Sequence, residues 1–145
     1  MAQGRFAMAV HALTILAESP DGACSAFLAA SVNTHAAFLR RVLSRLAQAG
    51  LIEAREGRDG GYRLAMAPER ITLGAVYRAT VDEPAILPNP AGPNPFCPTS
   101  RAMGPVFAEI AAGGEAAMLA WLDSRSLADV ASSAAQAVSA SSSAG

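Results

Sequence analysis

The sequence predicts a mainly α-helical chain with one small β-hairpin and a long helix in its C-terminal half. Residues 33–50 repeat apolar side chains with the period of an amphipathic helix. Residues 51–65 contain two strand-like runs around a Gly-rich reversal. Residues 101–122 space their apolar side chains as a heptad repeat. We expect these three stretches to organise the rest of the chain.

Length and composition indicate one domain with, at most, an appendage. The 145 residues are 52% hydrophobic, and no apolar run approaches the roughly 20 residues of a membrane span. The first residues lack the basic-then-apolar layout of a signal peptide. These two observations favour a cytoplasmic protein with no membrane partner. Two cysteines, Cys24 and Cys97, are too few for a disulfide scaffold.

Charge divides the chain into two unlike parts. All eleven basic residues are arginines. Residues 1–78 hold nine of them against six acidic residues, a net charge of +3, and residues 79–145 hold two against six, a net charge of −4. The N-terminal part therefore suits a polyanion and the C-terminal part does not.

Two helices are predicted before residue 33. Residues 4–18 carry a main apolar face and a second stripe of Met8 and Ile15, so we expect this helix to be buried on two sides. After a turn at residues 19–22, Ser25 can cap a short helix over residues 26–31, with Phe27 and Leu28 pointing inward. Residues 32–34 then form a tight turn.

The next helix separates apolar from basic side chains. Asn33 or Thr34 can cap its start, and Gly50 can end it. Its two arcs are Phe38, Leu39, Val42, Leu43 and Leu46 on one side, and Arg40, Arg41, Ser44, Arg45 and Gln48 on the other. A hairpin follows, with its Gly-rich reversal at residues 58–61. This order of parts predicts a winged helix-turn-helix, whose third helix enters a DNA major groove and whose wing lies along the backbone.

Prolines divide the C-terminal half. Thr72 can cap a helix over residues 73–80, and residues 82–98, with six of the nine prolines, form an extended linker. The long helix that follows carries a seam suited to a second copy of itself. The seam consists of Met103, Phe107, Ile110, Gly114, Ala117 and Trp121. Glycines 113 and 114 either break this helix or mark a close crossing of two helices, which we favour.

The chain is expected to end without a regular element. Ser126 can cap a last turn over residues 127–130, and the uncharged residues 132–145 are expected to be disordered. We therefore predict a winged helix-turn-helix domain at 1–81, a linker at 82–98, a dimerisation helix with its C-terminal turn at 99–131, and a disordered tail at 132–145.

In this arrangement the chain resembles the Rrf-two family of bacterial transcription regulators, the family of IscR, NsrR and CymR. The resemblance runs from about residue 6 to residue 130. It rests on FAMAVHALTILA, FLRRVLSRLAQAGLIEAREGRDGGYRLA, ITLGAVYRA and SLADV, in that order. It implies a winged helix-turn-helix, a long C-terminal dimerisation helix, and a homodimer that binds a palindromic operator, usually as a repressor.

The chain departs from the family pattern in three places. Cluster-binding members carry three closely spaced cysteines in the linker, where this chain has Cys97 alone. That count excludes a conventional iron–sulfur cluster, so no cofactor is predicted, and PNPFCPTSRAMGPVF resembles the clusterless branch. In the wing, Glu56 stands where many members have arginine. In the third helix, Arg40 stands where some members have an acidic residue.

The third helix supplies the main candidate contacts to double-stranded DNA. Arg40, Arg41 and Arg45 are predicted to bind bases or phosphates, and the small Ala37 leaves room for close approach to the groove floor. His35, in the first turn, is a further candidate contact. The alternative for Arg45 is that it packs over the edge of the core.

The wing and two helix N-termini supply the remaining candidates. Arg55, Arg58 and Arg63 could bind phosphate or the minor groove, although Arg63 could equally be a solvated strand residue. Ser25 and Thr34 could donate hydrogen bonds to phosphate at helix N-termini, or could serve only as caps.

Cys97 is the one candidate sensor. The N-terminus of the long helix and Arg101 would favour its thiolate form, which could become a sulfenic acid or form a disulfide with its copy in a dimer. The alternative is a small apolar residue under the proline loop. We expect Cys24 to be buried or idle, and we do not expect His11 or His35 to complete a metal site.

A protein-interaction module and an enzyme are the two other classes of function. A winged helix can bind protein without any operator, and the modest charge of +3 together with Glu56 in the wing keeps this alternative open. An enzyme is not predicted, because the sequence offers no nucleophile–base pair, metal set or phosphate loop. The GRDGG stretch is a hairpin tip and does not open a helix as a nucleotide loop would.

Overall fold

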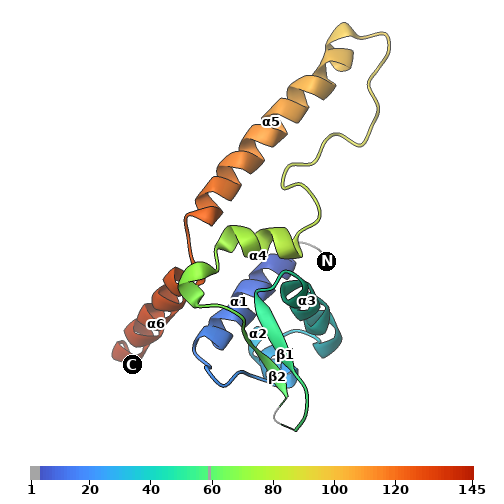
Figure 1. Cartoon of the computed structure of the whole chain (residues 1–145). Helices are drawn as coiled ribbons and strands as arrows, with labels where there is room; N and C mark the ends of the chain where they lie inside the picture. Colours follow the sequence, from blue (N-terminus) through green and yellow to red (C-terminus); the bar gives the residue numbers. More distant parts are fainter. Residues whose placement is uncertain (1–3, 59) are drawn as a thin grey trace.

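The computed structural model describes residues 4–58 and 60–145, so Asp59, in the predicted reversal, lies outside the described residues. The predicted fold class is confirmed: the chain is mainly helical with one two-stranded antiparallel hairpin (Figure 1). The elements are α1 (Arg5–Ala17), α2 (Ser25–Val32), α3 (Ala36–Gln48), β1 (Ile52–Arg55), β2 (Gly61–Leu64), the 3-10 helix η2 (Pro68–Arg70), α4 (Leu73–Thr80), α5 (Pro98–Asp123) and α6 (Leu127–Ser143).

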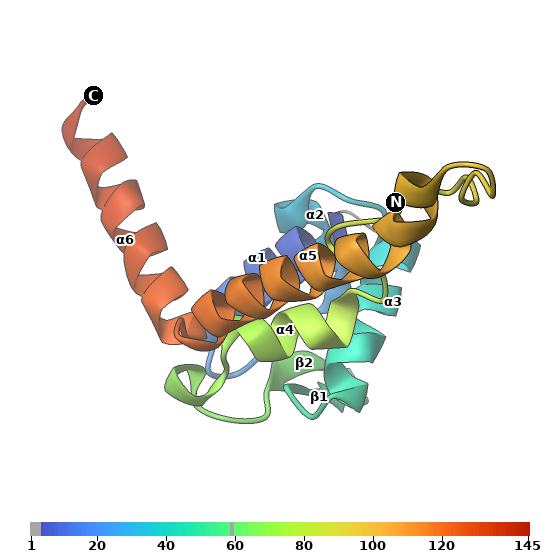
Figure 2. The same ribbon diagram turned by 90° about the horizontal axis from the view of Figure 1, so that it is seen from above.

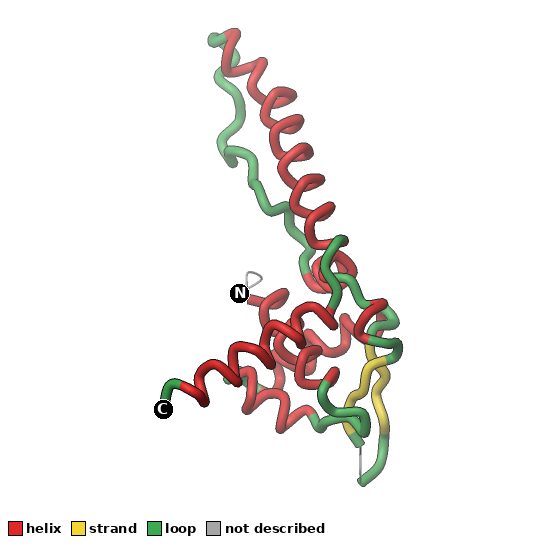
Figure 3. Tube along the Cα trace, turned by 90° about the vertical axis from the view of Figure 1, so that its left-hand side faces the viewer, coloured by secondary structure: helices red, strands yellow, loops and turns green. Residues whose placement is uncertain are grey.

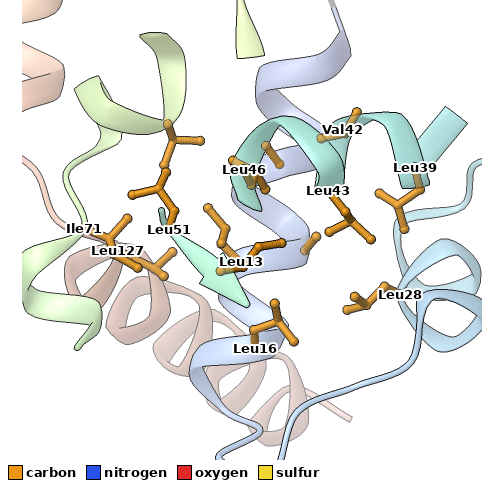
Figure 4. Packing of buried hydrophobic residues seen from close by; sticks show 14 of the residues in the cluster. Leu13, Leu16, Leu28, Leu39, Val42, Leu43, Leu46, Leu51, Ile71 and Leu127 are labelled. Atoms are coloured by element: carbon orange, nitrogen blue, oxygen red, sulfur yellow. The ribbon is translucent and has the colours of Figure 1, made fainter. Parts of the chain in front are cut away.

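One hydrophobic core joins both ends of the chain. Helix α1 lies at the centre of this core and contacts α2, α3, α4, α6 and β2. Met8 and Ile15, the second apolar stripe of α1, are half-buried. Figure 4 shows α1 and α3 facing each other across this core, with Ile71 and Leu127 closing one side. Leu127, at the start of α6, is fully buried. The C-terminal segment is therefore part of the same packing unit as the helix-turn-helix.

The helix caps around the turn of the helix-turn-helix differ from the sequence prediction. Cys24, rather than Ser25, is the N-cap of α2, and its Sγ accepts a hydrogen bond from the Phe27 N–H at 3.5 Å. Asn33 adopts a left-handed conformation (φ 61°) that ends α2, so neither Asn33 nor Thr34 caps α3 with its side chain. An asparagine tolerates that conformation better than most residues, which explains its position in the turn. Phe27 was expected to point inward but is 57% exposed.

Helix α3 ends at Gln48, and the chain turns out of the helix as predicted at Gly50. That residue has φ 76°, its N–H donates to the Ala47 carbonyl, and the Leu51 N–H donates back to the Leu46 carbonyl. These two bonds form a Schellman motif, for which glycine is favoured because the left-handed conformation strains other residues. The motif turns the chain directly into β1.

The hairpin is held to the turn between α1 and α2. Its register pairs Ile52 with Leu64 and Arg55 with Gly61. Ala23 exchanges two backbone hydrogen bonds with Tyr62, at 2.9 and 2.8 Å. A Cβ on Gly61 would overlap the Ala23 carbonyl, so this glycine allows the two backbones to approach. Gly61 therefore serves this backbone contact in addition to its place in the predicted reversal.

Helix α5 projects from the helical body, and the linker runs beside it (Figures 1 and 3). The helix begins at Pro98 and continues unbroken through Gly113 and Gly114, which excludes the predicted alternative of a helix break. Gly114 faces the linker of its own chain, because a Cβ there would lie 2.8 Å from Ile86 Cδ1, whereas Gly113 faces open space. Among residues 4–58 and 60–145, no helix combines the length and hydropathy that a bilayer crossing requires.

The C-terminal residues form a helix where disorder was expected. Ser126 caps α6 as predicted, in a capping box with Asp129, but the helix continues through Ser143 (Figure 2). Alanine has the highest intrinsic helix propensity, and it recurs along this segment. The start of α6 is fixed to the body by the Leu127 N–H, which donates to the Ile71 carbonyl at 2.8 Å. The small apolar content of the segment limits its tertiary packing but does not prevent local helix formation.

Candidate nucleic-acid interface

Helix α3 presents one apolar and one basic face. Leu39, Val42, Leu43 and Leu46 are fully buried. Burying each such side chain contributes about 1.5–3 kcal/mol, so this arc fixes the rotation of the helix. The opposite face carries Ala37, Arg40 and Arg41, and all three are exposed.

The two exposed arginines of α3 differ in their surroundings. The Arg41 guanidinium lies over the Phe38 ring, 5.7 Å from its centroid, and this contact restricts the side chain before any ligand binds. Arg40 projects one residue earlier on the same exposed face. Within the described residues, neither arginine forms an ion pair with an acidic side chain. Both guanidinium groups can therefore bind an anion without first releasing a carboxylate.

The N-terminal ends of α2 and α3 hold the smaller predicted contacts. Ser25 is the first residue of α2 and is half-buried, and Thr34, in the turn, is also half-buried. His35 occupies the N-cap position of α3, is exposed, and makes no side-chain capping hydrogen bond. Its imidazole is therefore available to an external partner.

The wing places two of its three arginines beside the start of α2. Arg55 and Arg58 are exposed and, with Cys24, line a cavity of about 230 Å³ between the wing and the α1–α2 turn. Cys24 is exposed rather than buried, and sequence reasoning gave it no role. Arg63 differs from the other two because its Nε donates to Glu53 Oε2 at 2.9 Å across the hairpin.

Arg45 is the one arginine of α3 with a carboxylate partner among the described residues. Its Nη1 and Nη2 donate to Oδ1 and Oδ2 of Asp82, each at 2.8 Å. This pair raises the pKa of Arg45 and lowers that of Asp82, chiefly through the side-chain hydrogen bonds. Arg5 of α1 also donates to Asp82 Oδ2, at 3.3 Å. No periodicity or motif links Asp82 to the helix, so this contact could not be predicted from the sequence.

Comparison with known proteins assigns the family. A family model named Rrf2 and described as "Iron-dependent Transcriptional regulator" matches residues 2–133. The chain belongs to the Rrf2 family. This is the Rrf-two family that its motifs resemble, and it is a family of transcription regulators rather than enzymes.

Three relatives illustrate the similarity. YwnA of Bacillus subtilis, named provisionally as an HTH-type transcriptional regulator, is 32% identical over 130 residues, which cover 90% of this chain and 96% of YwnA. A crystal structure described provisionally as that of a DNA-binding protein is 31% identical, with a TM-score of 0.71 over 87% of this chain and 97% of the other. CymR of B. subtilis, described as the global cysteine regulator, is 25% identical, with a TM-score of 0.57 over 86% and 93% of the two chains.

The donor residues of this Rrf2 chain do not fit the iron that the family description mentions. Cys97 is the N-cap of α5, where its Sγ accepts a hydrogen bond from the Ser100 N–H at 3.4 Å. The second cysteine, Cys24, lies at the wing. Within the described part of the chain, no three His, Cys, Asp or Glu side chains lie close enough together to share a metal ion. We therefore derive no role for iron in this protein.

Proposed function

We propose that this Rrf2-family transcription regulator binds DNA as a homodimer, recognises a palindromic operator, and represses transcription from it. The observation that carries the proposal is the outward face of α3. Arg40 and Arg41 are exposed there, and the side chain of Ala37 beside them is too small to obstruct a groove. A helix of this kind fits a major groove, and bidentate arginine contacts to guanine are the commonest base-specific contacts there. The wing arginines Arg55 and Arg58 would bind the phosphate backbone.

The homodimer is supported by the surface of α5. Of its predicted seam residues, all but the half-buried Phe107 are exposed in the single chain, including Trp121 at 59%. A soluble chain rarely leaves such a row of apolar side chains in water, so a second copy that covers it is the simplest partner. Gly114 of the seam faces the linker of its own chain, whereas Gly113 beside it faces open space and would permit a close crossing.

Selection from a random duplex library tests the operator. We expect the enriched sites to be inverted repeats, because two copies of α3 related by a two-fold axis read two half-sites. Transcription in vitro from a promoter that contains the selected site then tests repression, the usual role in the family that the motifs resemble. If no motif is enriched, the interaction-module alternative is favoured instead.

A redox response through Cys97 is part of the proposal. Peroxide would convert the Cys97 thiol to a sulfenic acid and release water, and a second Cys97 in a dimer could displace a further water to form a disulfide. Binding of the wild type to the selected site should change on oxidation, and binding of Cys97→Ser should not. An identical response in both proteins would exclude Cys97 as the sensor. The search for an effector would then move to the cavity of about 650 Å³ between the linker and α5.

A further inference from the structure

We infer that Asp82, the first residue of the linker, limits how α3 binds DNA, because it holds Arg45 in an ion pair and keeps this arginine from contacting DNA. The inference rests on the proposed function, because it assumes that α3 faces DNA. It adds a residue outside the helix-turn-helix to the set that governs binding.

The contacts of Asp82 occupy the Nη1–Nη2 edge of the Arg45 guanidinium. Both Nη atoms of Arg45 donate to the two carboxylate oxygens at 2.8 Å. A guanidinium binds phosphate or guanine through a similar pair of parallel N–H groups. The Nη1–Nη2 edge of Arg45 therefore cannot bind Asp82 and DNA at the same time. Arg45 is therefore unlike Arg40 and Arg41, which stand on the same helix without a carboxylate partner among the described residues.

Asp82 also joins three segments of the chain at one carboxylate. Its Oδ2 accepts from Arg5 of α1 at 3.3 Å as well as from Arg45 of α3. The side chain of Arg5 is 19% exposed and that of Asp82 58%, so α1 anchors the pair on its inner side while the linker residue stays accessible. An ion pair this exposed contributes little to folding stability. The ion pair instead determines whether Arg45 is available to DNA. A change in the path of the linker would move the Asp82 carboxylate away from Arg45.

A second pair of the same chemistry provides a matched control. Arg78 of α4 donates through both Nη atoms to Asp123 at the end of α5, at 2.7 and 2.8 Å. This pair lies at the α4–α5 junction and involves no residue of α3 or the wing. Asp123→Asn therefore changes the net charge as Asp82→Asn does, and breaks a bidentate arginine pair, without altering the recognition helix.

The test is a double-mutant cycle read by the salt dependence of binding. A fluorescent 30-base-pair duplex of mixed sequence is titrated with wild type, Asp82→Asn, Arg45→Gln and the double variant over a range of salt concentrations. We expect Asp82→Asn to steepen the log–log salt slope by about 0.9, the value for one further phosphate neutralised. The double variant should return to the wild-type slope, and Arg45→Gln alone should leave it unchanged. Asp123→Asn should bind as the wild type does.

Three outcomes would overturn the inference. The first is an unchanged slope in Asp82→Asn, and the second is an equal steepening whether or not Arg45 is present, which indicates a general charge effect. The third is a loss of slope in Arg45→Gln alone. Asp82→Glu keeps a carboxylate at this position, so this variant should have the wild-type slope. If the wild type does not bind duplex DNA, the proposed function fails and the inference fails with it, whereas an unchanged Asp82→Asn in a protein that binds DNA overturns the inference alone.

Discussion

Individual residues fix the wing against the rest of the domain. Gly22 has φ 89°, and a Cβ on it would lie 2.6 Å from the Tyr62 carbonyl oxygen. Gly57, in the wing itself, has φ 105° but faces open space. The two positions share a backbone conformation that disfavours side chains, and only Gly22 adds a steric overlap.

Substitution of these two glycines separates the effect of backbone strain from the effect of steric overlap with Tyr62. We predict that Gly22→Ala lowers the free energy of unfolding by about 1–3 kcal/mol more than Gly57→Ala does, because overpacking against a fixed backbone adds that amount. Urea unfolding of the two variants measures the difference. Equal losses would show that the close contact between the α1–α2 turn and β2 does not constrain the fold.

Sequence reasoning predicted the exposed face of α3 better than the contacts of its arginines. The arc of α3 that carries Arg40 and Arg41 followed from the helical period, because packing of the opposite arc determines it. The partner of Arg45 did not follow, since Asp82 lies 37 residues away in the chain, within a stretch that has no period. The cap of α2 was misassigned by one residue because serine is a favoured N-cap and cysteine is not.

At the scale of the element, α6 is defined by its first turn. The Ser126 side chain accepts from the Asp129 N–H at 3.1 Å, and the Asp129 carboxylate accepts from the Ser126 N–H at 2.8 Å. The hydrogen bond from the Ser126 backbone is the largest cause that lowers the pKa of Asp129 below its ordinary value of 3.8. Stability from this bond is fully present above that value and is lost as the pH falls through the lowered pKa.

Removal of this cap should destabilise the protein in a pH-dependent way. We predict that Ser126→Ala lowers the free energy of unfolding by about 1 kcal/mol at neutral pH. The Ser126 hydroxyl also lowers the pKa of Asp129, and the stability from this contribution is lost once Asp129 is protonated, so the difference from wild type should shrink in acid. Ser132→Ala, at an exposed position of the same helix, should be neutral or slightly stabilising. Thermal unfolding at two pH values tests both variants, and equal losses in the two would contradict the cap.

At the scale of the whole molecule, α5 projects away from the helical body that carries α3 and the wing (Figure 1). The wing and the free end of α5 lie at opposite ends of the molecule (Figure 3). The apolar seam is therefore available for association while α3 and the wing remain free for DNA. The sequence predicted this division through the linker prolines and the heptad spacing. The sequence did not predict that α6 packs against α1.

The association has a direct test within α5. We predict that Ile110→Glu shifts the protein from dimer to monomer, because it introduces a charge into the seam. Ala112→Glu introduces the same charge at an exposed position two residues away and outside the seam, and should leave the dimer intact. Sedimentation velocity measures the oligomeric state. A wild type that sediments as a monomer, or two variants that behave alike, would contradict an α5 interface.

The measurement that tests the central claim most directly is the affinity for the selected operator across a range of salt concentrations, for wild type and Arg41→Ala. Arg70→Ala serves as the control, because Arg70 is an exposed arginine in η2, which packs beside α6. We predict a steep fall of wild-type affinity with salt, with a slope of about −0.9 for each phosphate neutralised. Arg41→Ala should either flatten this slope or relax the preference at one base position, and Arg70→Ala should do neither. Wild-type binding that is indifferent to salt, or equal behaviour of the two variants, would contradict the assignment of α3 as the helix that reads DNA.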